Sequence, residues 1–193
     1  MSFDNIPLHF SCTCGDVQGV VETSALRDGV HAACFCSDCR AAQLYFGQPD
    51  PAPGPVALFQ TAPDRMTITE GLDKLGLMRL GPNGLLRWYA TCCNAPLCNT
   101  LKSPKFPFVG IPVDRFAAPE RLGPVQVQGF IAAPDGKTRH KGAGRMVWRM
   151  FSRFFTAWTS GRWRDTPFFD LKTGKPVAEA EIPTREQRTA LYR

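Results

Sequence analysis

Short runs of apolar and β-branched residues, separated by turn residues, dominate the first two thirds of this 193-residue chain. Runs of four to eight such residues, bounded by Gly, Pro, Asn or Asp, are typical of β-strands. They predict two strands within 7–23 and further strands over 30–35, 56–61, 66–70, 75–80, 85–91, 106–112 and 125–131. The pattern therefore predicts a mainly β fold.

Turn residues between these runs support the same picture. The sequence Gly81-Pro82-Asn83-Gly84 separates two apolar runs, and Asn-Gly favours a hairpin because both residues tolerate positive φ. Four prolines between residues 47 and 55 predict a loop, since proline cannot donate to a strand ladder.

Helical patterns are concentrated near the end of the chain. The best candidate is 145–158, and 184–192 predicts a short terminal helix with Thr184 as its cap and Gln187 completing a capping box. Residues 40–46 predict a short helix or turn. We expect one domain over 1–193, with a β core over 8–100 and a basic helix and C-terminal tail over 137–193 packed on that core.

Positive charge is concentrated in the predicted helix and the residues beside it. The chain has a formal charge of +6, and the segment 137–164 contains eight Lys or Arg residues and no Asp or Glu. Arg145, Arg149 and Arg153 recur every four residues and predict one basic stripe. The favoured interpretation is a helix packed on the sheet with these arginines in solvent. The alternative is an anionic partner at the stripe, either nucleic acid or a membrane surface.

The eight cysteines change this picture most, because they fall into three tight groups. Thiolates one or two residues apart supply two zinc ligands from one turn, and a distant pair completes a tetrahedral site. The sequence therefore predicts bound Zn2+. A disulfide framework is the alternative, and the short Cys-x-Cys spacings disfavour it. The three groups are Cys12 with Cys14; Cys34, Cys36 and Cys39; and Cys92, Cys93 and Cys98.

Composition and the N-terminal segment predict a cytoplasmic protein. Apolar residues make up 44% of the chain, and no apolar run approaches the roughly 20 residues of a membrane span, so no transmembrane segment is expected. Residues 1–7 lack a basic region followed by an apolar run, so no secretory signal is expected. A reducing compartment would keep the thiols free for metal.

Three motifs together resemble the glutathione-dependent formaldehyde-activating enzyme family, which includes centromere protein V. The first is Cys12-Thr13-Cys14-Gly15, and the second is Cys34-Phe35-Cys36-Ser37-Asp38-Cys39-Arg40. The third is the predicted strand Leu86-Arg87-Trp88-Tyr89, which precedes the last cysteine group. The resemblance extends from about residue 10 to residue 97, and the middle motif is its most specific part.

The resemblance implies a β-tent-like, zinc-stapled fold with two metal sites. One zinc is structural and is held by the first and third motifs. The other is held by Cys34, Cys36 and Cys39, which the resemblance makes the catalytic residues. That site leaves a position for substrate, and the implied activity is a carbon–sulfur lyase type of reaction that forms S-hydroxymethylglutathione from formaldehyde and glutathione.

The third motif departs from the family pattern. Cys93 occupies the second ligand position, but Ala90 stands where the first ligand is expected, and Asn94 replaces a glycine. Asn tolerates the left-handed backbone better than other non-glycine residues. Cys92 can supply the missing ligand only if the chain turns there, because adjacent side chains on a strand point to opposite faces. Otherwise Cys92 is a small core residue.

Several neighbouring residues have two interpretations. Arg40 either offsets the negative charge of a three-thiolate zinc site and holds a substrate carboxylate, or it pairs with a surface acid. The basic helix is a second candidate for binding the carboxylates of glutathione. We expect Cys98 to be a buried core residue and the three histidines, His9, His31 and His140, to be structural.

Two other classes of function compete with the lyase-like one. A non-catalytic zinc-binding module would contact nucleic acid, membrane or protein through the basic helix. A redox or metal-handling protein would use exposed thiolates that lose metal and oxidise readily.

Overall fold

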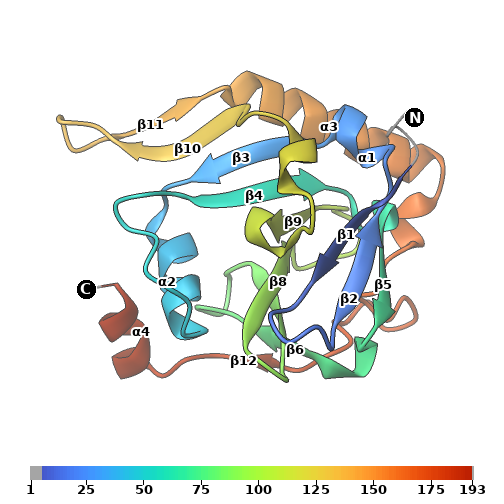
Figure 1. Ribbon diagram of the computed structural model, residues 1–193, viewed down its shortest axis with the longest axis horizontal. Helices are drawn as coiled ribbons and strands as arrows, with labels where there is room; N and C mark the ends of the chain where they lie inside the picture. The colour runs from blue at the N-terminus through green and yellow to red at the C-terminus, as the bar shows by residue number, and fades with distance from the viewer. Residues whose placement is uncertain (1–5, 193) are drawn as a thin grey trace.

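Two β-sheets form the body of the protein in the computed structural model, which describes residues 6–192 (Figure 1). The mainly β class with a C-terminal helix, which the strand-length apolar runs predict, is confirmed. Within the described residues, the smaller sheet has the order β1-β2-β5 and is antiparallel throughout. Its strands are β1 (Leu8–Ser11), β2 (Gln18–Val21) and β5 (Met66–Glu70).

The larger sheet has the order β11-β10-β3-β4-β9-β8-β7-β6-β12 in the described chain. Two of its pairings are parallel, β10 with β3 and β12 with β6. Its strands are β3 (Val30–Cys34), β4 (Val56–Thr61), β6 (Leu75–Met78), β7 (Leu86–Ala90), β8 (Ala95–Thr100), β9 (Val109–Pro112), β10 (Val127–Ala132), β11 (Thr138–Lys141) and β12 (Ala180–Glu181).

The main core joins the two sheets. Leu8 and Val21 of the smaller sheet belong to the same buried cluster as Trp88 and Ile111 of the larger one. Trp88 is fully buried, and its indole N–H donates to Thr100 Oγ1 at 2.9 Å, which removes the cost of burying that polar group. The turns at the ends of these strands are therefore held on a rigid frame.

The hairpin between β6 and β7 forms as predicted, with its turn at residues 81–84. Leu75 pairs with Ala90 and Met78 with Arg87. The turn is closed by a hydrogen bond from the Gly84 N–H to the Gly81 carbonyl at 3.0 Å. Pro82 and Asn83 form its centre, and neither Asn83 nor Gly84 is among the residues of 6–192 with positive φ, so the turn does not use the left-handed backbone that Asn-Gly tolerates.

The larger sheet extends beyond residue 100. β9 lies between β4 and β8, and β10 pairs with β3. The sequence pattern did not predict β8, β11 or β12. Pro96 lies within β8, all four residues of β11 are exposed, and β12 has only two residues, so none shows the apolar alternation of a strand.

Residues 6–192 form four α-helices, which lie at the periphery of the sheets (Figure 1). The predicted capping box at Thr184 and Gln187 is confirmed. Within the described chain, no helix has the length and apolar character needed to cross a membrane. The helices are α1 (Ala25–Asp28), α2 (Ser37–Tyr45), α3 (Ala143–Thr159) and α4 (Arg185–Leu191).

The predicted basic stripe of α3 does not lie in solvent. Arg153 is 5% exposed and donates from Nη1 to the Asp28 carbonyl at 2.6 Å, and Arg149 donates to the Arg27 carbonyl. Of the three stripe residues, Arg145 alone is exposed. The expectation of a solvent-facing stripe, available as a whole to an anionic partner, is therefore wrong. The carbonyl groups at the end of α1 draw two of the guanidinium groups inward.

Candidate functional site

Seven of the eight cysteines gather in two clusters in the part of the chain that the structure describes. In each cluster the sulfur atoms all lie within 4.8 Å of one another, so each cluster could hold a metal ion. No histidine or carboxylate belongs to either cluster as described. The first cluster is Cys12, Cys14, Cys92 and Cys93, and the second is Cys34, Cys36 and Cys39.

Two turns from different sheets build the first cluster. The β1–β2 turn carries Cys12 and Cys14, and it is closed by a hydrogen bond from the Cys12 N–H to the Val17 carbonyl at 2.9 Å. Gly15 has φ +84 within this turn, a left-handed conformation that glycine adopts without strain. The β7–β8 turn carries Cys92 and Cys93.

The sulfur separations in the first cluster suit a tetrahedral ion. A metal with four bonds of about 2.3 Å to sulfur requires sulfur atoms roughly 3.8 Å apart. Cys12 Sγ lies 3.5 Å from Cys14 Sγ and 3.9 Å from Cys92 Sγ. Cys92 Sγ lies 3.2 Å from Cys14 Sγ and 4.0 Å from Cys93 Sγ. The residues present therefore fit a four-cysteine zinc site.

The chain turns at Cys92, and this turn brings its sulfur into the cluster. Both Cys93 and Asn94 donate their N–H groups to the Ala90 carbonyl, at 3.3 and 2.8 Å. Ala90 is the last residue of β7 and is fully buried, so it offers no ligand. Of the two alternatives for Cys92, the geometry favours the ligand over the core residue.

Asn94 adopts the left-handed conformation in this turn, with φ 56. We expect Asn94→Ala to lower the free energy of unfolding by about 1 kcal/mol, because a residue with a Cβ and no local hydrogen-bonding side chain is strained there. Asn94→Gly, the matched control, is expected to be neutral within about 0.5 kcal/mol. Urea unfolding of both variants measures the difference, and equal losses would contradict the assignment.

The second cluster forms where β3 passes into α2. Cys34 ends β3, Cys36 is the N-cap of α2, and Cys39 lies in its first turn. Cys36 Sγ accepts a hydrogen bond from the Cys39 N–H at 3.3 Å and lies 3.3 Å from Cys34 Sγ. An N-cap side chain and the residue three positions later meet at the start of a helix. The spacing Cys-x-Cys-x-x-Cys therefore brings three sulfurs together.

The three thiols of the second cluster differ in pKa. Hydrogen bonds from the thiols of Cys34 and Cys39 lower the pKa of Cys36 to about 2, and its position at a helix N-terminus suits a thiolate. The pKa of Cys34 is raised by its bond to Cys36, and that of Cys39 by its bonds to both and by burial. Three thiolates in one cluster would repel one another, so the thiols of Cys34 and Cys39 keep their protons while Cys36 loses its proton. A cation that binds all three sulfurs must therefore displace two protons.

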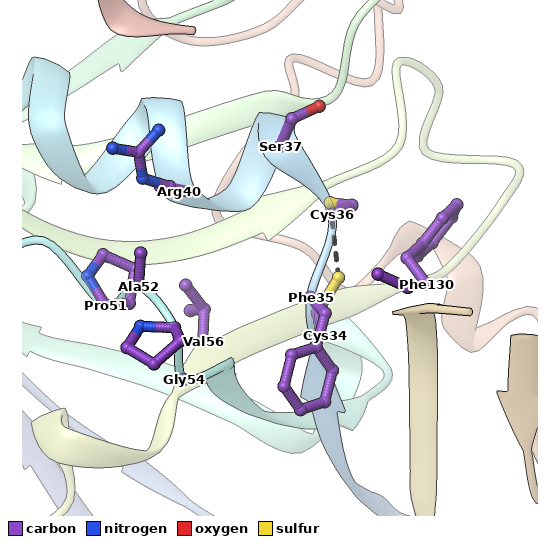
Figure 2. Close-up of a pocket in the computed structure, with 12 residues that line it drawn as sticks. Cys34, Phe35, Cys36, Ser37, Arg40, Pro51, Ala52, Gly54, Val56 and Phe130 are labelled. Carbon is purple, nitrogen blue, oxygen red and sulfur yellow. Dashed lines mark hydrogen bonds between the residues drawn. The ribbon is translucent and has the colours of Figure 1, made fainter. Parts of the chain in front are cut away.

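A hollow of about 190 Å³ lies beside the second cluster (Figure 2). Cys34 and Cys36 line it, whereas Cys39 is buried behind them. The side chains of Phe35 and Phe130 form an apolar part of its wall. Phe130 has φ 62 and lies at an irregularity in the pairing of β10, the kind of bulge that turns a side chain toward a site.

Arg40 also lines this hollow, but Asp50 holds its guanidinium group. Arg40 donates from Nε to Asp50 Oδ1 at 2.8 Å and from Nη2 to Asp50 Oδ2 at 2.7 Å. The same contacts lower the pKa of Asp50 to about 2. Of the two interpretations of Arg40, the geometry favours the paired surface residue over a group free to bind a substrate carboxylate.

A buried cation, Arg87, makes a small contribution to the electrostatics of the second cluster. Arg87 lies in β7, is 5% exposed, and its charge contributes to the lowered pKa of Cys36. Its Nη1 lies 3.4 Å from Asn99 Oδ1, and its buried Nε has no partner in residues 6–192. An arginine within the apolar run 85–91 is the sequence signal that could have identified it.

We expect Arg87→Met to weaken zinc binding at the second cluster about tenfold, because it removes a buried positive charge that favours the Cys36 thiolate. Arg40→Met is the control for loss of an arginine near the same hollow, and its expected effect is less than about threefold, since Asp50 already neutralises Arg40. Competition with a chromophoric chelator measures both affinities. A larger effect at Arg40 would contradict this assignment.

The remaining candidates lie outside the two clusters. Cys98 is buried in the main core, where desolvation raises the pKa of its thiol. His31 Nδ1 lies 2.7 Å from the Gly123 carbonyl, and His140 Nδ1 accepts from the Phe130 N–H at 3.3 Å. These contacts match the expected structural roles of both histidines.

Comparison with known proteins identifies the family. Residues 4–181 match the family described as "Family of unknown function (DUF6151)". The chain belongs to this family.

A search of curated proteins found no match to this DUF6151 member. Among solved structures, it is similar to the crystal structure of a Rhodobacter sphaeroides protein, a structural genomics target. The two chains are 21% identical, the match covers 61% of this chain and 96% of the other, and the TM-score is 0.43.

Proposed function

We propose that this protein is a two-zinc protein whose three-cysteine cluster acts on a thiol–aldehyde adduct, as a carbon–sulfur lyase type of enzyme. One observation carries the proposal: Cys34, Cys36 and Cys39 converge, and two of these three cysteines line an open hollow. The resemblance to glutathione-dependent formaldehyde-activating enzymes supports glutathione and formaldehyde as the reactants.

The donor sets favour zinc and distinguish the two clusters. Clusters made only of thiols suit zinc, which binds sulfur in tetrahedral geometry. Four cysteines complete the coordination of one ion, which is typical of a structural site. Three cysteines leave one position for a substrate group, which is typical of a catalytic site. The first cluster would therefore stabilise the fold, and the second would perform the chemistry.

A zinc ion at the second cluster would supply deprotonation of a substrate thiol at neutral pH. The hollow would hold the thiol and the aldehyde next to Cys34 and Cys36, with Phe35 and Phe130 excluding water from one side. In the forward direction the sulfur–carbon bond forms, the carbonyl π bond breaks, and the thiol proton ends on the hydroxyl oxygen of the adduct. Arg87 would offset the negative charge of the three thiolates.

The test is an NMR measurement of exchange between formaldehyde, glutathione and S-hydroxymethylglutathione. Zinc-loaded protein is expected to accelerate exchange above the rates with buffer, with free zinc and with metal-free protein. If protein shown to contain two zinc ions per chain exchanges the adduct no faster than free zinc does, the lyase-like function is contradicted. The protein would then be assigned as a non-catalytic metal-binding module.

A further inference from the structure

Helix α3 exposes its apolar face. Trp148, Phe151, Phe155 and Trp158 follow one another at spacings of three, four and three residues, which places them on one face of a helix. Trp148 is 74% exposed and Phe155 is 72% exposed. A helix on a globular core usually turns such a face inward. Within residues 6–192 the 103–106 segment contacts this face at Trp158, and all four rings stay more than half exposed.

The polar side of α3 attaches it to the protein. Arg149 and Arg153 bind carbonyl groups of α1, and Ala157 is buried beside them. Figure 1 shows α3 along the outer side of the molecule, next to the β10–β11 hairpin. These contacts fix the orientation of the helix, so the aromatic face does not result from a loosely attached element.

Aromatic residues from a second segment extend this surface. Phe106 is 49% exposed, and its ring centroid lies 6.1 Å from that of Phe154. The indole N–H of Trp158 donates to the Lys105 carbonyl at 2.6 Å. A tryptophan such as Trp158, which exposes its apolar ring while its N–H is hydrogen-bonded, suits the boundary between water and lipid.

Exposed cations lie on the segment that leads into α3. Lys137, Arg139, Lys141 and Arg145 are all exposed, and they lie on the β11 hairpin and the first turn of α3. Asp135 lies 3.7 Å from Arg139, and the sequence from 136 to 164 contains no Asp or Glu. An apolar helical face with adjacent Lys and Arg is typical of helices that lie in the interface of an anionic membrane.

We propose that α3 docks the protein on the surface of an anionic lipid bilayer, with Trp148, Phe151, Phe155 and Trp158 in the interface and the adjacent cations on lipid headgroups. Nucleic acid is a poorer occupant, because Arg149 and Arg153 are turned away from the exposed face and that face is apolar. A symmetric pair of copies is also a poorer occupant, because the same cations would face one another. This docking is independent of the proposed reaction.

Flotation of the full-length protein with vesicles tests the proposal. Vesicles of phosphatidylcholine with phosphatidylglycerol are expected to carry the protein upward and to shift its tryptophan emission to shorter wavelength, whereas pure phosphatidylcholine vesicles bind it less. Added salt and the double variant Lys141→Glu/Arg145→Glu are each expected to weaken binding.

The decisive variant is Trp148→Ser/Phe155→Ser, which removes two exposed rings and leaves the buried side of α3 unchanged. We expect at least about tenfold weaker partition. The matched control is Leu72→Ser/Ile182→Ser, at positions with 53% and 52% exposure outside α3, and its binding is expected to be unchanged. Metal content and circular dichroism check that both variants fold.

Three outcomes would overturn the proposal. The first is failure of the wild-type protein to float with anionic vesicles. The second is equal binding by the Trp148→Ser/Phe155→Ser variant. The third is self-association or nucleic-acid retention that the same variant abolishes, with no vesicle binding by the wild type.

Discussion

Cys12→Ser is expected to cause the largest loss of stability among single cysteine variants. Cys12 is the buried member of a four-sulfur cluster that joins the turns of two sheets. Structural zinc supplies about 10–16 kcal/mol to small zinc-finger domains, so loss of one ligand should cost roughly 3 kcal/mol or more. Elemental analysis should find one zinc ion per chain instead of two, and urea unfolding should show the loss of stability.

Cys98→Ala provides the control, because Cys98 is equally buried but lies outside both clusters. It is expected to keep two zinc ions per chain and to lose about 1 kcal/mol, the cost of a small cavity. The metal assignment of the first cluster is contradicted if Cys12→Ser retains both ions, or if the two variants lose equal stability.

Cys36→Ser is expected to abolish adduct exchange while it changes stability by less than about 1 kcal/mol. Cys36 is the N-cap of α2, and serine is one of the best N-cap residues, so the helix start should be preserved. The substitution removes the sulfur that lies between Cys34 and the N–H group of Cys39. Elemental analysis should again show the loss of one zinc ion, this time without a large change in unfolding.

Cys14→Ser distinguishes the two centres, because Cys14 is an exposed member of the first cluster. It should lose one zinc ion and keep the exchange rate measured per folded chain. Persistent exchange in Cys36→Ser, or loss of exchange in Cys14→Ser at full folding, would reverse the roles assigned to the two clusters.

Local sequence patterns predicted some of the strands that position the clusters, β3 and β7 among them, but not β8, which follows the turn with Cys92 and Cys93. The bounds of β4 and β5 agree with the apolar runs 56–61 and 66–70. The spacing Cys-x-Cys-x-x-Cys predicted that Cys34, Cys36 and Cys39 would group, because it places all three sulfurs at one strand-to-helix junction. The meeting of Cys12 and Cys14 with the third motif was implied by the family resemblance, not by spacing. The sequence left Cys92 as either a ligand or a core residue, and the turn after Ala90 favours the ligand.

Features that depend on long-range packing could not be predicted. Helical periodicity shows which residues share a face, but not which face is buried. Arg149 and Arg153 point inward because the end of α1, more than a hundred residues earlier, presents carbonyl groups to them. The effect of Arg87 on Cys36 likewise joins β7 to a residue about fifty positions earlier in the chain. The strands β8 and β11 are recognised from their pairing partners rather than from their own residues.

The first cluster also bears on how the protein is made. Cys14 and Cys92 are 78 positions apart in the chain, although their sulfurs lie 3.2 Å apart. During translation the earlier pair leaves the ribosome well before the later pair, so a nascent chain can hold an ion there with at most two sulfurs. If the first cluster holds zinc as proposed, its coordination would be complete only after the β7–β8 turn has been synthesised, and a shortage of zinc would then affect a late step of folding rather than an early one.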